Sequence, residues 1–166
     1  TPEMVSKGWD AAFKRTVTIT KLTDILSSKA IYYFNTHLDH IGEAARTESS
    51  QMIVNEIGKY SNEYPVILSG DFNYRSISDG YKIIASKIFD TKLISKTEST
   101  GGNITFNGFG KDIQPDNKID FIFVIFKLNK QIFIIIVYSL LYLSNDNHRH
   151  LYNSKKRFSY LKNIYC

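Results

Sequence analysis

The chain has 166 residues, the usual size of a single domain, and 43% of them are hydrophobic, which allows a buried core. Its one cysteine, Cys166, excludes a disulfide framework and any cysteine-based metal site. The net charge of +5 is concentrated in residues 127–166, because residues 1–126 hold 14 basic and 15 acidic side chains.

The first predicted elements are two strands and a helix. Polar and β-branched apolar residues alternate over residues 15–22, and a second β-rich segment covers residues 31–36, so a turn at residues 24–29 would close a hairpin. Residues 43–60 show helical spacing, and their charged residues, including Glu56, are expected away from the buried face. The expected buried face consists of Ala45, Ser49, Met52, Ile53 and Ile57.

The next elements continue a mixed α/β pattern. Residues 66–68 form a continuously apolar strand, as expected for a strand covered on both faces, and a short helix follows at about residues 77–88. Further strands are predicted at residues 104–106 and 119–126. This order of elements is typical of layered α/β domains.

Residues 127–166 differ in composition from the rest of the chain. Lys, Asn, Ile, Phe, Tyr and Leu dominate them, and they contain no glycine or proline. Either they are genuine strands followed by a basic terminus, or they are translated from a shifted reading frame of an A/T-rich gene. Their longest apolar run, residues 132–143, is shorter than the roughly 20 residues of a membrane span, so no stable membrane insertion is expected.

Three segments carry residues suited to phosphate chemistry. Asp71 and Asn73 follow the apolar strand, at the strand end where open α/β sheets bind ligands, or they form an Asp-x-Asn turn. His37 could hydrogen-bond a phosphate or transfer a proton, or it could be a surface histidine. Asp120 begins an apolar strand, where its carboxylate would need a histidine or a salt bridge as partner.

A zinc site is a second interpretation of the segment around His37. His37, Asp39 and His40 carry suitable ligand atoms, but zinc needs a further ligand in good geometry and no cysteine is available for it.

In their order, these segments resemble the motifs of the endonuclease/exonuclease/phosphatase superfamily, which has the DNase I-like fold. The family's THL, GDFN and IDxIF motifs correspond to residues 36–38, 70–73 and 119–123. Residues 6–15 and 37–46 are similar to a subgroup whose substrate is poorly defined. The resemblance covers about residues 4–126 and implies a partial four-layer α/β sandwich with two mixed β-sheets, the N-terminal half of which is missing.

The resemblance also implies a role for each matching residue. His37 would contact the scissile phosphate, Asp71 would orient or deprotonate the attacking water, and Asn73 would hold a phosphate oxygen. Asp120 would pair with a histidine, His37 being preferred. The residues expected to bind or support the substrate are Asn35, Trp9, Asp10 and Arg15.

Two family features lack a clean counterpart. The principal metal-binding Glu is expected to be absent from this chain, whose N-terminus shows no signal peptide and is expected to be truncated. The family's final Ser-Asp-His has only a degraded match in residues 144–148, where His148 would be catalytic and Asp146 a metal ligand. Residues 1–126 are therefore interpreted as a partial domain, and residues 127–166 as a degenerate or frame-shifted segment.

The expected function is hydrolysis of a phosphodiester or phosphomonoester by activated water with Mg²⁺ or Mn²⁺, in a chain that is incomplete and weakly active or inactive. The substrate would be a nucleic acid, a sugar phosphate or a lipid headgroup. Two alternatives stay open: a non-catalytic relic or binding module of the same fold, and a basic nucleic-acid-binding domain.

Overall fold

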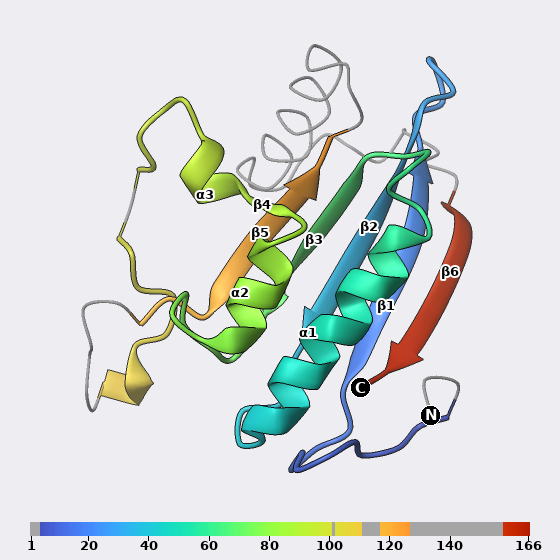
Figure 1. The fold of residues 1–166 in the computed structure, drawn as a ribbon. Helices are drawn as coiled ribbons and strands as arrows, with labels where there is room; N and C mark the ends of the chain where they lie inside the picture. The colour runs from blue at the N-terminus through green and yellow to red at the C-terminus, as the bar shows by residue number, and fades with distance from the viewer. Residues whose placement is uncertain (1–3, 101, 111–116, 127–157) are drawn as a thin grey trace.

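The computed structural model describes residues 4–100, 102–110, 117–126 and 158–166, which form one mixed sheet in the order β4-β5-β3-β2-β1-β6 (Figure 1). The strands are β1 (Thr16–Thr23), β2 (Ala30–His37), β3 (Val66–Asp71), β4 (Phe89–Asp90), β5 (Asp120–Ile125) and β6 (Phe158–Tyr165). The helices are α1 (Glu43–Gly58), α2 (Asp79–Ala85), α3 (Thr91–Ile94) and the 3-10 turn η1 (Gly108–Gly110).

The strand pairing brings three chain segments to one edge of the sheet. β1 and β2 form the predicted antiparallel hairpin, and α1 then connects β2 to β3, which lies parallel to it. β5 is antiparallel to β3. Because of these directions, β2 and β3 end at the edge where β5 begins (Figure 1).

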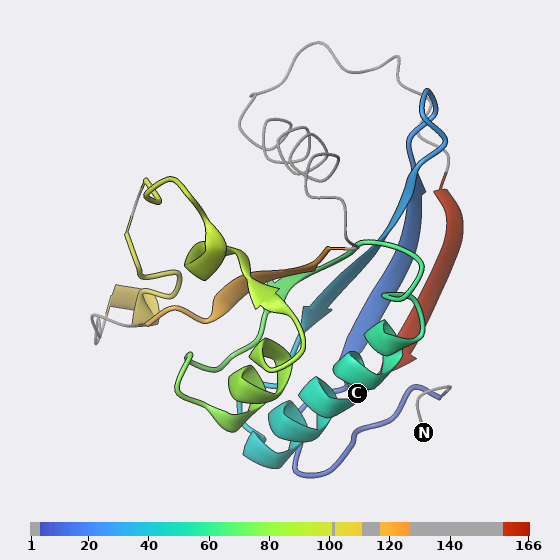
Figure 2. The same ribbon diagram turned by 45° about the horizontal axis from the view of Figure 1, so that its top comes forward.

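The helices α1 and α2 cover one face of this sheet, as both views show (Figures 1 and 2). Apolar side chains of the strands and of the two helices interlock there in a single core, from which water is excluded. Its fully buried members include Val17, Ile19, Phe34, Ile53, Ile57, Leu68, Ile84 and Phe123.

Of the two elements predicted between residues 77 and 106, one forms with shorter bounds and the other is wrong. The helix predicted at about residues 77–88 forms as α2 but ends at Ala85, because β4 follows at Phe89 and extends the sheet beyond β5. Residues 104–106 form no strand; the backbone N–H groups of Thr105 and Phe106 both donate to Asn117 O instead, which closes a loop.

The outer strand β6 comes from the compositionally biased end of the chain. It pairs antiparallel with β1, and Lys162 Nζ donates to Glu56 Oε1 at 2.8 Å. Glu56 is therefore buried, at 6% exposure, and not on a solvated face as predicted. Residues 127–157, with Asp146 and His148, lie outside the described residues, so their interpretation stays a prediction.

The described residues contain one of the two sheets that the sequence predicts for a four-layer sandwich. Among them, no helix combines the length and the apolarity that crossing a membrane requires.

Candidate functional site

His37, Asp71 and Asp120 form a row across three adjacent strands, here called the polar row. His37 is the register partner of Asp71, and Asp71 is the register partner of Asp120. Paired residues point to the same face of a sheet, and successive residues point to opposite faces. Since Phe121 is buried among the aromatic rings under α2, the polar row lies on the face opposite the helices.

His37 and Asp71 contact each other directly. His37 Nε2 lies 3.5 Å from Asp71 Oδ2, and the other carboxylate oxygen of Asp71 accepts a hydrogen bond from Asn73 N at 2.9 Å. The side chains of His37 and Asp71 are 56% and 31% exposed. Both groups therefore remain accessible to a ligand.

Asn73 joins the ends of β2 and β3. Its backbone has φ 51°, a left-handed conformation that asparagine tolerates better than most residues, and its Nδ2 donates to Leu38 O at 2.9 Å. Leu38 N in turn donates to Asp71 O at 2.9 Å. The second amide hydrogen of Asn73 has no partner in the described part of the chain, so it is available to a phosphate oxygen.

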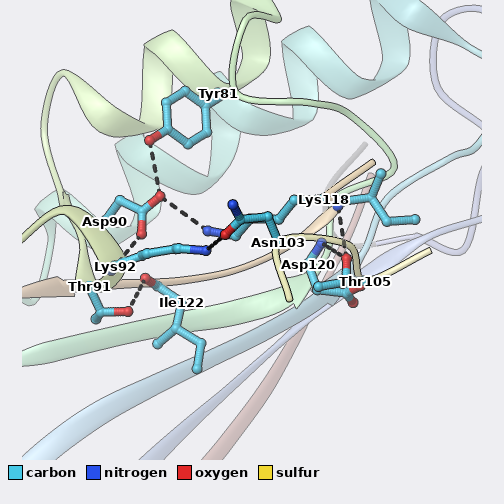
Figure 3. Close-up of polar contacts among 10 residues, drawn as sticks. Tyr81, Asp90, Thr91, Lys92, Asn103, Thr105, Lys118, Asp120 and Ile122 are labelled. Carbon is cyan, nitrogen blue, oxygen red and sulfur yellow. Dashed lines mark hydrogen bonds and ion pairs between the residues drawn. The ribbon is translucent and has the colours of Figure 1, made fainter. Parts of the chain in front are cut away.

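Asp120 is in the polar row but does not pair with His37, the preferred partner; the other histidine considered, His148, lies outside the described residues. Within the described ranges, the carboxylate that contacts His37 belongs to Asp71, and Asp120 is exposed. Because water can solvate its carboxylate, Asp120 does not need the ion pair that burial would have required. Its backbone N–H donates to Thr105 Oγ1 at 3.1 Å, which ties the start of β5 to the preceding loop (Figure 3).

A buried carboxylate, Asp90, supports the start of β5 from the helix side (Figure 3). It accepts hydrogen bonds from Tyr81 Oη at 3.0 Å and from Lys92 N at 2.9 Å, and Lys118 Nζ lies 3.6 Å away. Burial and the nearby charge of Asp90 raise the pKa of Tyr81 to about 12. No local sequence pattern predicted this cluster, because its members come from three parts of the chain: α2, the continuous segment of β4 and α3, and the residues before β5.

Asp39 is a structural residue and not a ligand of the zinc site considered for His37, Asp39 and His40. It is 2% exposed, and its carboxylate accepts hydrogen bonds from the backbone N–H groups of Phe13, Ile41 and Gly42 at 2.8 to 2.9 Å. Burial alone would raise its pKa, but these three donors hold the pKa well below its usual value. The carboxylate therefore joins the backbone at Phe13 to the turn that precedes α1.

The residues predicted to shape a substrate pocket have different surroundings. Asp10 accepts hydrogen bonds from Ala44 N and Ala45 N at 3.2 and 2.7 Å, so its carboxylate caps the N-terminus of α1. Trp9 is 53% exposed, and the buried Nε of Arg15 has no hydrogen-bond partner in the part of the chain that is described.

Asn35 lies on the same sheet face as His37, two residues earlier in β2. Its Nδ2 donates to Ser69 Oγ at 3.1 Å, and this hydroxyl also contacts Tyr33 Oη at 2.6 Å. Asn35 thus links β2 to β3 beside the polar row.

The described residues offer a divalent cation few protein ligands. No three His, Cys, Asp or Glu side chains gather among them as a metal-binding group. The polar row contributes two carboxylates, and Mg²⁺ in phosphate sites is often held by one or two carboxylates together with the phosphate and waters. Asp71 and Asp120 are therefore the residues of the row whose oxygens suit such a cation.

The fold matches that of solved structures. The chain is similar to a mannosyl-6-phosphatase from Bacteroides thetaiotaomicron, with 31% identity over 75% of this chain and 48% of that one and a TM-score of 0.68. An endonuclease/exonuclease/phosphatase from Bacteroides vulgatus is 36% identical over 72% of this chain and 47% of its own, with a TM-score of 0.65. No protein-family model and no curated protein sequence matches the chain.

More distant similarity shows the fold alone. Zebrafish (D. rerio) TDP2, solved with a single-strand DNA product, is 20% identical over 66% of this chain and 46% of its own, with a TM-score of 0.51. The chain spans about half the length of each of these structures. It therefore has the DNase I-like α/β fold of the endonuclease/exonuclease/phosphatase family, as its motifs predicted.

Proposed function

We propose that this chain is the part of a phosphoester hydrolase that binds the scissile phosphate and activates water. The observation that carries the proposal is the polar row, in which an imidazole and a carboxylate lie 3.5 Å apart beside a second carboxylate at one edge of the sheet. The similarity to a sugar-phosphate phosphatase supports a phosphate ester as the substrate class.

In the proposed reaction, a water oxygen attacks phosphorus and the bond between phosphorus and the ester oxygen breaks. Asp71 accepts the proton of the attacking water, since its carboxylate is partly exposed and oriented by Asn73 N. His37, when protonated, donates a proton to a phosphate or leaving-group oxygen. The free amide hydrogen of Asn73 holds another phosphate oxygen.

Asp120 and Asp71 would hold a divalent cation, Mg²⁺ or Mn²⁺, together with the phosphate. Two carboxylates repel a phosphate anion, and a bound cation supplies the positive charge that offsets this repulsion and stabilises the transition state. Because the described residues give the cation only these carboxylates, we propose that cation and phosphate each bind weakly alone and more tightly together.

The proposed activity of this chain by itself is weak or absent. The chain spans about half of the phosphatase that it resembles, and we propose that a complete site needs further groups from outside the matched region. A non-catalytic protein that retains phosphate binding is the alternative outcome.

Binding and turnover test the proposal separately. Isothermal titration with inorganic phosphate, with and without Mg²⁺, should show binding that Mg²⁺ strengthens and that Asp71→Asn weakens. Asp79→Asn is the matched control, because Asp79 is exposed in α2 and pairs only with Lys82 among the described residues. Release of p-nitrophenol from p-nitrophenyl phosphate then distinguishes a weak enzyme from a binding protein. Absence of phosphate binding in the presence of Mg²⁺ would refute both the enzyme and the phosphate-binding protein.

A further inference from the structure

Phe109 combines an unfavourable backbone conformation with exposure to solvent. Its φ and ψ are 54° and 33°, and it lies between Gly108 and Gly110, whose φ values are 59° and 77°. A bulky side chain rarely adopts this left-handed conformation, which suits the flanking glycines. The ring is 87% exposed, so core packing does not explain it. Such outliers occur preferentially at ligand-binding sites.

The loop that carries Phe109 is fixed to the polar row. Thr105 N and Phe106 N donate to Asn117 O, and Asn117 Nδ2 donates back to Phe106 O at 3.0 Å. Thr105 Oγ1 also accepts hydrogen bonds from the backbone N–H groups of Ile119 and Asp120. The base of the loop is therefore held where the polar row reaches β5 (Figure 3).

Local contacts also hold the tip of the loop. Phe109 N donates to Asn107 Oδ1 at 3.1 Å, and Gly110 N donates to Asn107 O at 2.9 Å. The rings of Phe106 and Phe109 meet edge to face, with centroids 5.5 Å apart and planes at 89°. This contact orients the Phe109 ring and leaves most of its surface to solvent.

The short chain segment between Thr105 and Phe109 limits how far Phe109 can lie from the start of β5. Thr105 and Phe109 are four residues apart, a span of at most about 14 Å for an extended chain. Both ribbon views place η1 beyond the edge of the sheet at which β5 begins (Figures 1 and 2). Phe109 therefore lies within about 14 Å of Thr105, whose Oγ1 accepts the hydrogen bond from Asp120 N at the end of the polar row.

We infer that Phe109 is a specificity residue that stacks on the ring of a phosphate ester whose phosphate occupies the polar row. This inference rests on the proposed function. The ligand chemistry is a ring that presents a flat face to the aromatic side chain, either the C–H face of a sugar or a planar aromatic ring. An acyclic phosphate ester has no such face and gains nothing from Phe109.

The test measures the affinity of the whole chain for four probes by titration with Mg²⁺ present: inorganic phosphate, glycerol 2-phosphate, phenyl phosphate and mannose 6-phosphate. Phe109→Asn removes the ring but keeps a residue that tolerates the left-handed backbone, and Phe109→Trp keeps an aromatic face. Phe89→Asn is the matched control, since Phe89 is 56% exposed on β4 and lies away from the polar row.

We expect Phe109→Asn to weaken the binding of at least one cyclic ester about tenfold, as stacking contacts commonly contribute. Inorganic phosphate and glycerol 2-phosphate should bind as they do to the parent chain, and Phe109→Trp should retain the affinity. Loss for mannose 6-phosphate alone or phenyl phosphate alone identifies which ring is recognised.

Two results would overturn the inference. Equal affinity of Phe109→Asn and the parent chain for both cyclic esters removes the stacking role and leaves the phosphate site intact. An equal loss of affinity for all four probes means that Phe109 only stabilises the loop that contacts Asp120. If inorganic phosphate does not bind the parent chain, the proposed function fails and this inference fails with it.

Discussion

His37 and Asp71 occupy paired register positions on the parallel strands β2 and β3, with His37 Nε2 3.5 Å from Asp71 Oδ2. Exposed ion pairs of this kind contribute roughly 0–1 kcal/mol to stability. We therefore expect His37→Gln and Asp71→Asn to change the free energy of unfolding by less than about 1 kcal/mol, while each weakens Mg²⁺-dependent phosphate binding. Urea unfolding and phosphate titration of the same samples check this. A large loss of stability would mean that the pair is structural.

Gly70 permits the close approach of β2 and β3 on which the polar row depends. Its φ is 157°, and a Cβ atom at this position would lie 2.0 Å from the backbone oxygen of Thr36. Gly70→Ala should therefore force the two strands apart and lower the free energy of unfolding by about 3 kcal/mol or more. Gly58→Ala is the control, because a Cβ there meets nothing within 4 Å. In urea unfolding, equal stability of the two variants would contradict this prediction.

The sequence predicted best those elements whose pattern is local. The β1–β2 hairpin, α1, β3 and β5 all form within a few residues of their predicted bounds, since alternation and helical spacing depend on neighbours in the chain. The motif order also predicted that His37, Asp71 and Asp120 lie at one sheet edge.

The features that the sequence did not reveal depend on partners far along the chain. Glu56 is buried because Lys162, 106 residues later, supplies its counter-charge. Asp39 is buried because Phe13 N, 26 residues earlier, is one of its donors. The expected pairing of Asp120 with a histidine assumed a buried acid, whereas the start of β5 is open to solvent.

Asp39 should make stability depend on pH. Its pKa in the folded chain lies below the ordinary value near 3.8, so the stability that it contributes is present above pH 3.8 and is lost as the pH falls through the lower folded-state pKa. The Asp39 carboxylate uses both of its oxygens as acceptors, whereas an asparagine side chain has one acceptor oxygen. Its amide N–H group would therefore face a backbone N–H donor. Asp39→Asn should therefore lower the free energy of unfolding by about 2 kcal/mol at pH 7, and by less at pH 3.

Urea unfolding at pH 7, 5 and 3 measures this difference. Asp79→Asn serves as the control, because the Asp79 carboxylate is exposed and its variant should differ much less from the parent chain. A constant difference between Asp39→Asn and the parent chain over the whole range would show that Asp39 does not titrate as its surroundings require.

Glu56 and Lys162 join α1 to the outer strand β6. Glu56 Oε1 accepts hydrogen bonds from Lys162 Nζ at 2.8 Å and from Tyr60 Oη at 3.1 Å. Its other carboxylate oxygen, Oε2, accepts a hydrogen bond from Lys59 Nζ. Although burial would raise its pKa, these partners keep the pKa of Glu56 lowered. Lys162→Met removes one of them and should lower the free energy of unfolding by about 1–2 kcal/mol.

Hydrogen exchange shows which strands this loss of stability affects. We expect the amides of β6 to exchange faster in Lys162→Met while those of β2 and β3 keep their protection, because β1 is the strand with which β6 pairs in the described sheet. Lys82→Met, which removes an exposed pair with Asp79, should leave β6 unchanged. Protection of β6 in the parent chain would also show that residues 158–166 fold onto the domain, as genuine strands do and a random frame-shifted segment does not. Rapid exchange throughout β6 in the parent chain would favour the frame-shifted interpretation instead.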